Sequence, residues 1–338
     1  MTSLYKKLIS KFKNKKILVV GDLILDEYIL GTVSRISPEA PVPVVFQEES
    51  FYRPGGGANV ATNLKSLGAE VFLVGRRGAD LEGKILLREL TRRRLSTQGI
   101  WVDPDSPTSL KTRIIAQHQQ VVRVDREHNR DMKSSLNQKL ISFLGNIIPS
   151  VDALILSDYG KGTINPELIG KVSFLAHQHN KVIIIDPKVE HFSYYRGVTA
   201  ITPNKKEAEN AIRNIKISDR QGTALAIQTD RLNTNGEINR AGLELVKYLD
   251  LECLLLTLGQ QGMKLFERGK PPVNIPTTAQ EIYDVSGAGD TVVAVFTLAL
   301  TAGASKRQAA ELANRAAGVV VGKLGTVAIT KTELQEAL

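Results

Sequence analysis

A glycine-rich stretch near the carboxyl end of the chain leads directly into an apolar helical pattern. It reads Asp284-Val285-Ser286-Gly287-Ala288-Gly289-Asp290-Thr291, and the apolar run continues to Leu300. Glycines before a helix let backbone N–H groups approach an anion, and the helix N-terminus favours negative charge. This pattern predicts a cradle for a transferring phosphate, with Asp290 placed to accept the proton of an attacking hydroxyl. The structural alternative is an aspartate that caps a helix after a glycine turn.

Four further stretches carry residues that suit polar or anionic ligands. They are Gly21–Asp26 with Asp22 and Asp26, Gly55-Gly56-Gly57 with Asn59, Asn204-Lys205-Lys206-Glu207, and Thr257 to Gly262 with Gly259. Carboxylates that follow a buried strand can grip sugar hydroxyls, and glycine turns allow close approach of a ligand. Each stretch also has an ordinary structural explanation as a turn, a solvated acid or a helix-capping sequence.

Taken in order, the five stretches resemble the motifs of the ribokinase-like (PfkB) carbohydrate kinases. The resemblance covers nearly the whole chain and implies an ATP-dependent phosphotransferase that acts on a sugar hydroxyl. It implies catalysis by Gly287, Ala288, Gly289 and Asp290, and sugar binding by Asp22, Asp26, Gly55, Gly56, Gly57 and Asn59. It implies ATP binding by Asn204, Lys205, Lys206, Glu207, Thr257, Gly259 and Gly262, and an indirect role of Asn204 and Glu207 in positioning Mg²⁺.

Other segments resemble a narrower group, the D-glycero-β-D-manno-heptose 7-phosphate kinases. These segments are 35–45, 111–125, 157–162 and 186–188. The resemblance implies phosphorylation at the anomeric C1 hydroxyl, giving the 1,7-bisphosphate used for lipopolysaccharide-core precursors. The sequence departs from the group at Gln117, Val189 and Ser286, where Arg, Gly and Thr are common. The His-x-Gly-His motif of the cytidylyltransferase domain found in some members does not occur, so we expect a kinase-only form.

A sugar that already bears a phosphate needs cationic partners, and five residues in these segments are candidates. They are Lys111, Arg113, Arg123, Lys161 and Lys188. Arg offers a bidentate fork to a phosphate, and Lys offers a point charge. The alternative for each is a solvated side chain, and Arg123 could instead pair with Asp125.

Several other motifs fail on inspection. Gly78 to Lys84 matches the start of a P-loop, but Ile85 stands where Ser or Thr must bind magnesium. In the carbohydrate kinases that resemble this chain, this stretch lies on the sugar side. His177 and His179 are two residues apart on a predicted helix, so they face different directions and suggest no metal site.

Short apolar runs alternate with helical patterns along the chain. The predicted strands include 17–20, 71–74, 153–156, 182–185 and 253–256, and the predicted helices include 58–67, 81–95, 136–148 and 167–179. This order predicts an α/β fold with a doubly wound, mainly parallel sheet. Segments 32–51 and 111–125 interrupt the alternation and predict a small β-sheet lid, formed by about 31–54 and 109–126, on a single domain of residues 1–338. Segment 219–242 is polar and predicts an exposed loop.

The charge of the chain is concentrated at its start. The 338 residues carry a formal charge of +9, but six lysines fall in the first 16 residues and the remainder carries only +3. This distribution argues against a nucleic-acid coat, which needs many cations on the folded surface. We expect the first residues to form an amphipathic lead-in, with Leu4, Leu8, Ile9 and Phe12 facing the core and the lysines solvated.

The sequence also indicates where in the cell the protein works and what it binds. We find no membrane segment and no secretory signal, and Cys253 is the single cysteine, so we expect a cytoplasmic protein. The expected ligands are a sugar phosphate and ATP, and the exposed edges of a lid sheet favour a homodimer. The alternatives are a ribokinase-like kinase for another sugar or sugar phosphate, and a basic nucleotide- or nucleic-acid-binding protein that uses the N-terminal lysines.

Overall fold

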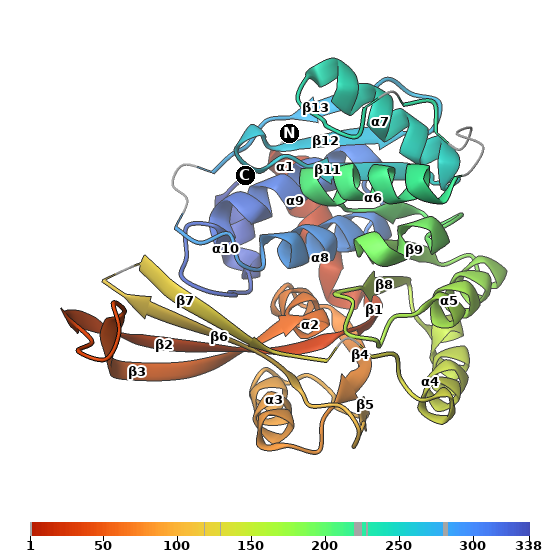
Figure 1. Ribbon diagram of the computed structural model, residues 1–338. Helices are drawn as coiled ribbons and strands as arrows, with labels where there is room; N and C mark the ends of the chain where they lie inside the picture. Colours follow the sequence, from red (N-terminus) through yellow and green to blue (C-terminus); the bar gives the residue numbers. More distant parts are fainter. Residues whose placement is uncertain (1, 118, 129, 220–224, 228, 280–282) are drawn as a thin grey trace.

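Two β-sheets organise the chain (Figure 1). The computed structural model describes residues 2–117, 119–128, 130–219, 225–227, 229–279 and 283–338. In spatial order the main sheet contains β13 (Val273–Ile275), β12 (Met263–Glu267), β11 (Cys253–Thr257), β10 (Ala200–Ile201), β9 (Val182–Asp186), β8 (Ala153–Ser157), β1 (Lys16–Gly21), β4 (Glu70–Arg77) and β5 (Gly99–Val102). Only the pairs that include β12 are antiparallel. The predicted mainly parallel sheet is therefore confirmed.

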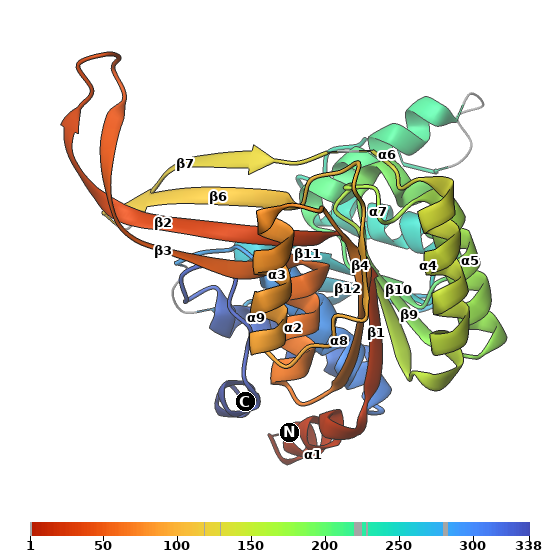
Figure 2. The same ribbon diagram turned by 90° about the horizontal axis from the view of Figure 1, so that it is seen from below.

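Helices cover both faces of the main sheet (Figure 2). One face carries α1 (Thr2–Ser10), α2 (Gly57–Ser66), α3 (Leu81–Arg92), α8 (Ala288–Thr301), α9 (Lys306–Val320) and α10 (Lys331–Glu336). The other carries α4 (Ser134–Ile147), α5 (Pro166–Gln178), α6 (Lys205–Ser218) and α7 (Asn235–Tyr248). Because successive side chains of a strand point to opposite faces, Ile17 and Val19 of β1 join one core while Leu18 and Val20 join the other. The doubly wound α/β architecture is confirmed.

A second sheet projects from this body (Figures 1 and 2). Its strands lie in the order β3 (Pro43–Gly56), β2 (Leu23–Ile36), β6 (Ser109–Ala116) and β7 (Gln119–Arg126). The two irregular segments thus form a separate small sheet, as predicted, although residue 118 lies outside the described residues. Strand β2 begins earlier than the predicted segment, because Ile24 already pairs with Gly55 on one side and Ser109 on the other. Asp26 consequently lies within the second sheet.

The prediction of a loop over 219–242 is wrong from Asn235 onward. Helix α7 begins there because Thr234 and Glu237 form a capping box, and Ile238 and Leu245 bury its apolar side. Residues 220–224 and 228 of the predicted loop lie outside the described residues. Asn235 and Gly236 are exposed in the first turn of this helix, whereas Asn239 Oδ1 is buried, so a polar composition did not distinguish a loop from an amphipathic helix here.

The N-terminal helix packs on the core with a different stripe from the predicted one. Tyr5, Leu8, Ile9 and Phe12 are buried, whereas Leu4 is 45% exposed, so the expectation for Leu4 is wrong. The spacing of Tyr5 and Leu8 at i and i+3 places both on the side that faces the core. No helix among the described residues is long and apolar enough to cross a membrane.

Candidate active site

Asp290 lies in the first turn of α8, at the carboxyl edge of the main sheet. It is 2% exposed, and its carboxylate accepts hydrogen bonds from Asn59 Nδ2 and from the Tyr159 hydroxyl, both at 2.8 Å. Asn59 belongs to α2 and Tyr159 follows β8, so two distant segments orient one carboxylate. Gly287 precedes the helix with φ of 76°, and a Cβ there would lie 2.6 Å from Asn59 Nδ2. Glycine is therefore required at this turn.

The surroundings of Asp290 place its proton equilibrium near neutral pH. Burial raises the pKa of Asp290 to about 7, while the hydrogen bonds from Asn59 and Tyr159 oppose this shift and the charge of Asp26 adds to it. A carboxylate in this range can take a proton at neutral pH and release it again. The hydrogen bonds from Asn59 and Tyr159 also hold the two carboxylate oxygens of Asp290, which would receive the proton of a hydroxyl group.

The start of α8 opens onto a cavity of about 280 Å³. Ala288 and Gly289 line it from α8, and a Cβ added to Gly289 would meet no atom within 4 Å. Thr257, Gly259 and Gly262 line it from the turn after β11. The first turn of a helix has N–H groups with no intrahelical acceptor, which suits an anion. The structure thus brings together the predicted phosphate cradle and the predicted nucleotide turn.

Asn204 and Glu207 form the capping box that begins α6. Asn204 Oδ1 accepts from the Glu207 N–H at 2.9 Å, and Glu207 Oε2 accepts from the Asn204 N–H at 2.8 Å. A β-bridge between Asn204 and Thr257 joins this helix start to the end of β11. Lys205 lies 4.0 Å from Glu209 on the same helix, and Lys206 is exposed. Neither lysine is among the described residues that line the 280 Å³ cavity.

Asp22 holds the loop that carries Tyr159. Its buried carboxylate accepts hydrogen bonds from the N–H groups of Tyr159, Lys161 and Thr163, each at 2.9 Å. Burial raises the pKa of Asp22, and these three N–H groups oppose the shift. The structure therefore places Asp22 beneath this loop, with its oxygens directed at the backbone.

Asp26 lies on the inner part of the second sheet, opposite the glycine turn. Arg113 Nη1 donates to Asp26 Oδ1 at 2.5 Å, and the Arg113 guanidinium lies over the Tyr28 ring. A Cβ added to Gly55 would lie 2.4 Å from Asp26 Oδ2, so the turn approaches this carboxylate closely. Burial raises the pKa of Asp26, and Arg113 opposes that shift.

Three of the remaining predicted cations gather where β6 and β7 leave the body. Lys111 lies 4.0 Å from Asp125, and Lys161 donates to Glu127 at 2.5 Å. Arg123 is paired with Asp125 at 2.9 Å, which is the structural alternative considered from the sequence. Burial lowers the pKa of Lys111, an effect that the carboxylates of Asp125 and Glu127 oppose.

Lys188 lies near Gly160 and Glu207. A Cβ added to Gly160 would lie 3.2 Å from Lys188 Cε, and the Lys188 charge acts on Glu207. Lys188 is therefore placed between the loop that holds Tyr159 and the start of α6.

Residues 14–333 match the model of the pfkB family carbohydrate kinase. The chain belongs to this family. The kinase is 41% identical over 330 residues to the bifunctional protein HldE of Desulfatibacillum aliphaticivorans, a match that covers 98% of this chain and 64% of that one. It is 44% identical over 320 residues to the protein of the same name from Helicobacter pylori strain HPAG1, covering 95% and 65%.

The chain thus spans slightly less than two thirds of the length of these relatives. Solved structures share the fold of the kinase at low identity. Ribokinase from Arabidopsis thaliana, complexed with ribose and ATP, superposes with a TM-score of 0.71 at 18% identity, covering 96% of this chain and 98% of that one. Phosphofructokinase-2 from Escherichia coli, in complex with substrates and products, gives a TM-score of 0.76 at 17% identity with the same coverage. The ribokinase-like fold is confirmed.

Two residues of the site lie in segments 157–162 and 186–188 but have no individual role in the prediction from sequence. The Tyr159 hydroxyl donates to Asp290, and Asp186 is a half-buried carboxylate at the end of β9. Burial raises the pKa of Asp186 well above its usual range, with further contributions from Asp290 and Glu207. A signal was present for both, because Tyr159 follows β8 before two glycines and Asp186 ends a buried parallel strand. Residues at the carboxyl ends of such strands gather at ligand sites.

Proposed function

We propose that this kinase transfers the γ-phosphoryl group of ATP to the anomeric C1 hydroxyl of D-glycero-β-D-manno-heptose 7-phosphate. The products would be the 1,7-bisphosphate and ADP, in the synthesis of ADP-heptose for the lipopolysaccharide core. The observation that supports the proposal is a buried carboxylate, Asp290, with a pKa of about 7 in the first turn of α8. Paired cations lie on the second sheet at Arg113 and on the loop after β8 at Lys161. The choice of sugar is supported by the segments that resemble heptose 7-phosphate kinases and by the relatives named bifunctional protein HldE.

The proposed mechanism assigns each step to a group of the chain. Asp290 takes the proton of the C1 hydroxyl, and the resulting oxygen attacks the γ-phosphorus in line with the departing ADP oxygen. The new bond joins the C1 oxygen to the γ-phosphorus, while the bond to the β–γ bridging oxygen breaks. Backbone N–H groups from Gly287 to Asp290 stabilise the charge on the transferring group. Asn59 and Tyr159 hold the carboxylate in position.

Sugar binding in this proposal involves the second sheet and the glycine turn. Gly55, Gly56 and Gly57 would admit the sugar beside Asp26 and Asn59, and Arg113, Lys111 and Lys161 would attract its phosphate. Asp22 would act as a positioning residue, since its oxygens bond the loop from Tyr159 to Thr163. The second sheet would serve as a lid that excludes water from the transfer.

The residues present fit a bound Mg²⁺ ion on the nucleotide side. Asp186 and Glu207 offer hard oxygen donors, and the electrostatic effect of Glu207 on Asp186 indicates that the two are near each other. In the part of the chain that the structure describes, no group of three His, Cys, Asp or Glu side chains could hold a metal ion alone. Mg²⁺ commonly retains water and substrate phosphate ligands, so a two-carboxylate edge with Asn204 suits it. When bound, the ion would neutralise charge on the ATP phosphates.

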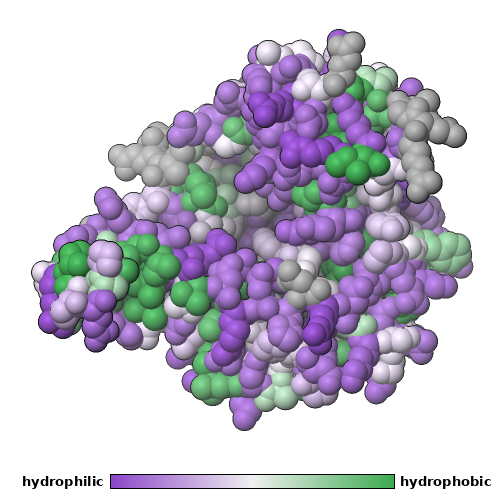
Figure 3. All heavy atoms as spheres, viewed as in Figure 1, coloured by the Kyte–Doolittle hydropathy of each residue, from purple (hydrophilic) through white to green (hydrophobic). Residues whose placement is uncertain are grey.

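The proposal also includes a homodimer in the cytoplasm, in which a second copy covers apolar side chains of the second sheet. Figure 3 shows apolar residues gathered on this projection. The exposed set is Ile36, Val42, Phe46, Val121, Val122 and Val124, with exposed fractions from 37% to 60%. Exposed patches of this kind are typical of association surfaces. Analytical ultracentrifugation of the wild type beside a Phe46→Ser, Val124→Ser variant tests it, and a monomeric wild type would contradict it.

The deciding experiment is a substrate panel assayed for ADP release. We expect D-glycero-β-D-manno-heptose 7-phosphate to give the highest kcat/KM, above fructose 1-phosphate, fructose 6-phosphate and unphosphorylated hexoses. Arg113→Ala and Lys161→Ala should raise the KM for the sugar phosphate more than the KM for ATP. A higher kcat/KM for another sugar would overturn the choice of substrate, and equal effects on both KM values would remove these cations from phosphate binding.

A further inference from the structure

A buried cluster of polar side chains links the loop after β8 to the loop after β9. Asp158 Oδ2 accepts hydrogen bonds from His191 Nδ1 and from the Tyr195 hydroxyl, both at 2.7 Å. Asp158 follows β8, whereas His191 lies in a 3-10 helix after β9 (Val189–Tyr194) and Tyr195 ends that helix. The Asp158 side chain is 0% exposed and the His191 side chain is 17% exposed. None of the three takes part in the phosphoryl transfer proposed above.

Two carboxylates hold the backbone around Tyr159. The N–H of Tyr159 donates to Asp22 Oδ2, and the N–H of Gly160 donates to Asp158 Oδ1, both at 2.9 Å. These two N–H groups flank the Tyr159 Cα, so the two acids fix the direction in which its side chain leaves the loop. The Tyr159 hydroxyl reaches Asp290 at 2.8 Å. The position of this hydroxyl therefore depends on both carboxylates.

The same two carboxylates repel each other. Asp22 and Asp158 are both buried, and after burial itself the charge of Asp158 is the main effect that raises the pKa of Asp22. Three backbone N–H groups compensate Asp22. In the described part of the chain, Asp158 accepts from a single backbone N–H, and its one ion-pair partner is His191. A buried carboxylate that lacks partners tends to take up a proton or to move toward water.

The surroundings of His191 favour its charged form. Its hydrogen bond to Asp158 raises the pKa of His191, burial opposes this shift, and the charges of Asp158, Asp131 and Asp22 add to it. Both ring nitrogens of a charged imidazole carry a proton, so Nδ1 donates to the carboxylate. His191 thus gives Asp158 a positive charge that no backbone group can supply.

Tyr195 holds the other side of the cluster. Its hydroxyl accepts from the Lys188 N–H at 3.0 Å while it donates to Asp158, and its side chain is fully buried. The Asp158 N–H also donates to the Asp186 carbonyl oxygen at 3.0 Å. The loops after two adjacent strands are therefore cross-linked at Asp158. Losing one donor to this carboxylate affects the loop that carries Tyr159.

We propose that His191 is a positioning residue for the phosphoryl transfer, which acts on the base Asp290 through the loop of Tyr159. Its charge and hydrogen bond keep Asp158 ionised and bonded to that loop. The loop in turn holds the Tyr159 hydroxyl against Asp290. Without His191, Asp158 is a buried carboxylate with no cation, and the loop relaxes away from this arrangement. The role of His191 rests on that of Asp290 as the base of the proposed reaction.

Two substitutions of His191 test this role through ADP release, with ATP and the sugar that gives the highest kcat/KM. His191→Ala removes the donor to Asp158, and we expect kcat to fall ~10-fold, as for Tyr159→Phe. His191→Asn keeps an N–H donor near the position of Nδ1. Its kcat should be at least ~3-fold higher than that of His191→Ala, because a hydrogen bond to a buried carboxylate is retained. Circular dichroism checks the fold of both variants.

A double-mutant cycle shows whether the effect passes through Tyr159. In a Tyr159→Phe background, His191→Ala should lower kcat by less than ~2-fold more, because the hydroxyl that it positions is already absent. A further loss of ~10-fold would mean independent effects and would overturn the proposal. Unchanged kcat in His191→Ala, or the same kcat in His191→Ala and His191→Asn, would overturn it as well.

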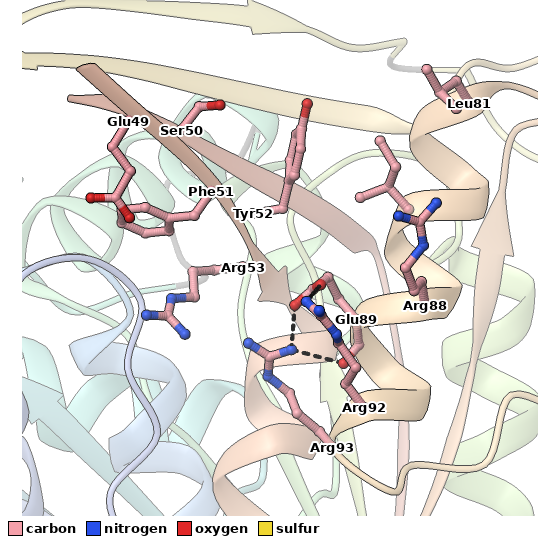
Figure 4. Close-up of a pocket in the computed structure, with 11 residues that line it drawn as sticks. Glu49, Ser50, Phe51, Tyr52, Arg53, Leu81, Arg88, Glu89, Arg92 and Arg93 are labelled. Atoms are coloured by element: carbon pink, nitrogen blue, oxygen red, sulfur yellow. Dashed lines mark hydrogen bonds and ion pairs between the residues drawn. The ribbon is translucent and has the colours of Figure 1, made fainter. Parts of the chain in front are cut away.

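Arg93→Ala is the matched control, because it removes a cation from another buried acid. Arg93 donates to Glu89 at 2.6 Å beside the pocket of about 770 Å³ between β3 and α3 (Figure 4). Among the described residues, neither side chain bonds the loop of Tyr159. We expect the kcat of Arg93→Ala to stay within ~2-fold of the wild type.

A loss of kcat in Arg93→Ala as large as that in His191→Ala would reveal a general effect of buried ion pairs, and would overturn the proposal. A wild type that releases no ADP with any sugar would overturn the proposed function and this role together. The contrary outcomes for the variants, in an active wild type, would overturn the role of His191 alone.

Discussion

At the scale of single residues, opposing effects on Asp290 explain how one carboxylate could serve as a base. Burial alone favours its protonated form, and a permanently protonated group cannot accept a proton. Hydrogen bonds from Asn59 and Tyr159 favour the charged form and bring the pKa back to about 7. The two donors therefore have an electrostatic role in addition to orienting the carboxylate.

Replacing Asp290 with Asn should remove the base while leaving the fold intact. An amide of the same shape can still contact Asn59 and Tyr159, but it accepts no proton. We expect kcat to fall at least ~100-fold, the lower limit for loss of a general base. ADP release at saturating substrates measures the effect, and circular dichroism checks the fold. Turnover like that of the wild type would remove Asp290 from this role.

The same variant makes a prediction about stability. An unfolded chain releases the Asp290 proton near pH 3.8, whereas the folded protein retains it to about pH 7. The carboxyl group therefore stabilises the wild type most at low pH, and this contribution is lost as the pH rises from about 4 to 7. Asp290→Asn lacks this loss, so its free energy of unfolding should exceed that of the wild type at pH 8 by roughly 2–4 kcal/mol. Thermal melts should converge near pH 4.

Tyr159→Phe should shift the pH dependence of the reaction. The Tyr159 hydroxyl lowers the pKa of Asp290, so its removal raises that pKa and leaves more of the base protonated at pH 7. We expect the acidic limb of the kcat profile to move toward higher pH, with activity at pH 7 falling ~10-fold and recovering in part at pH 9. Tyr194→Phe, at an exposed tyrosine, serves as the control. A profile of unchanged shape would leave Tyr159 with a packing role alone.

At the scale of elements, the start of α8 combines two glycines with different constraints. Gly287 has φ of 76°, and a Cβ there would collide with Asn59, whereas Gly289 is helical and a Cβ there would meet no atom within 4 Å. Gly287→Ala should destabilise the fold by about 1–3 kcal/mol and disturb the bond from Asn59 to Asp290. Gly289→Ala should fold at least as well as the wild type, since Ala is favoured within helices.

The two variants should therefore separate stability from nucleotide binding. We expect Gly289→Ala to raise the KM for ATP, because its methyl group enters the 280 Å³ cavity. Thermal melts and ATP titrations on both variants provide the comparison. An unchanged KM for ATP in Gly289→Ala would mean that the phosphates do not approach this turn.

How far the elements could be predicted depended on the range of the interactions that define them. Strands such as β1 and β8 carry uninterrupted apolar runs, because both of their faces are buried, and such runs are visible locally. Helix α7 was missed because its signal is the capping box of Thr234 and Glu237 within a polar segment. The early start of β2 was also missed, since it depends on pairing with β3 and β6, which are distant in sequence.

For the candidate site, too, features set by nearby residues could be predicted, whereas contacts between distant segments could not. The glycine turn at Gly287 and the helix start that carries Asp290 are local features, and their spacing in the sequence was enough to predict them. That Tyr159 bonds Asp290 could not, because 131 positions separate them and only the parallel sheet brings them together. The direction of the Asp22 carboxylate, toward backbone N–H groups, likewise depends on how the loop after β8 folds back.

At the scale of the whole molecule, the placement of charge matters more than its total. The first 16 residues contain six lysines. The same segment includes α1, whose other side buries Tyr5, Leu8 and Ile9 in the core. Removing residues 1–16 would thus take away part of the core as well as the charge. A deletion cannot separate a polyanion-binding arm from a structural helix, but substitutions on its two faces can.

Neutralising exposed lysines of α1 and of the 3-10 turn that follows it (Lys11–Asn14), and truncating the buried face of α1, should have different consequences. Lys6, Lys7 and Lys13 are exposed, and their side chains make no hydrogen bond or ion pair within the described residues, so their joint change to Gln should alter kcat/KM less than ~2-fold. Leu8→Ala should instead cost about 2–5 kcal/mol of folding free energy, because it leaves a cavity beside the core. Kinase assays and thermal melts on both variants test this division. A large loss of activity in the stable lysine variant would show that the N-terminal charge takes part in function.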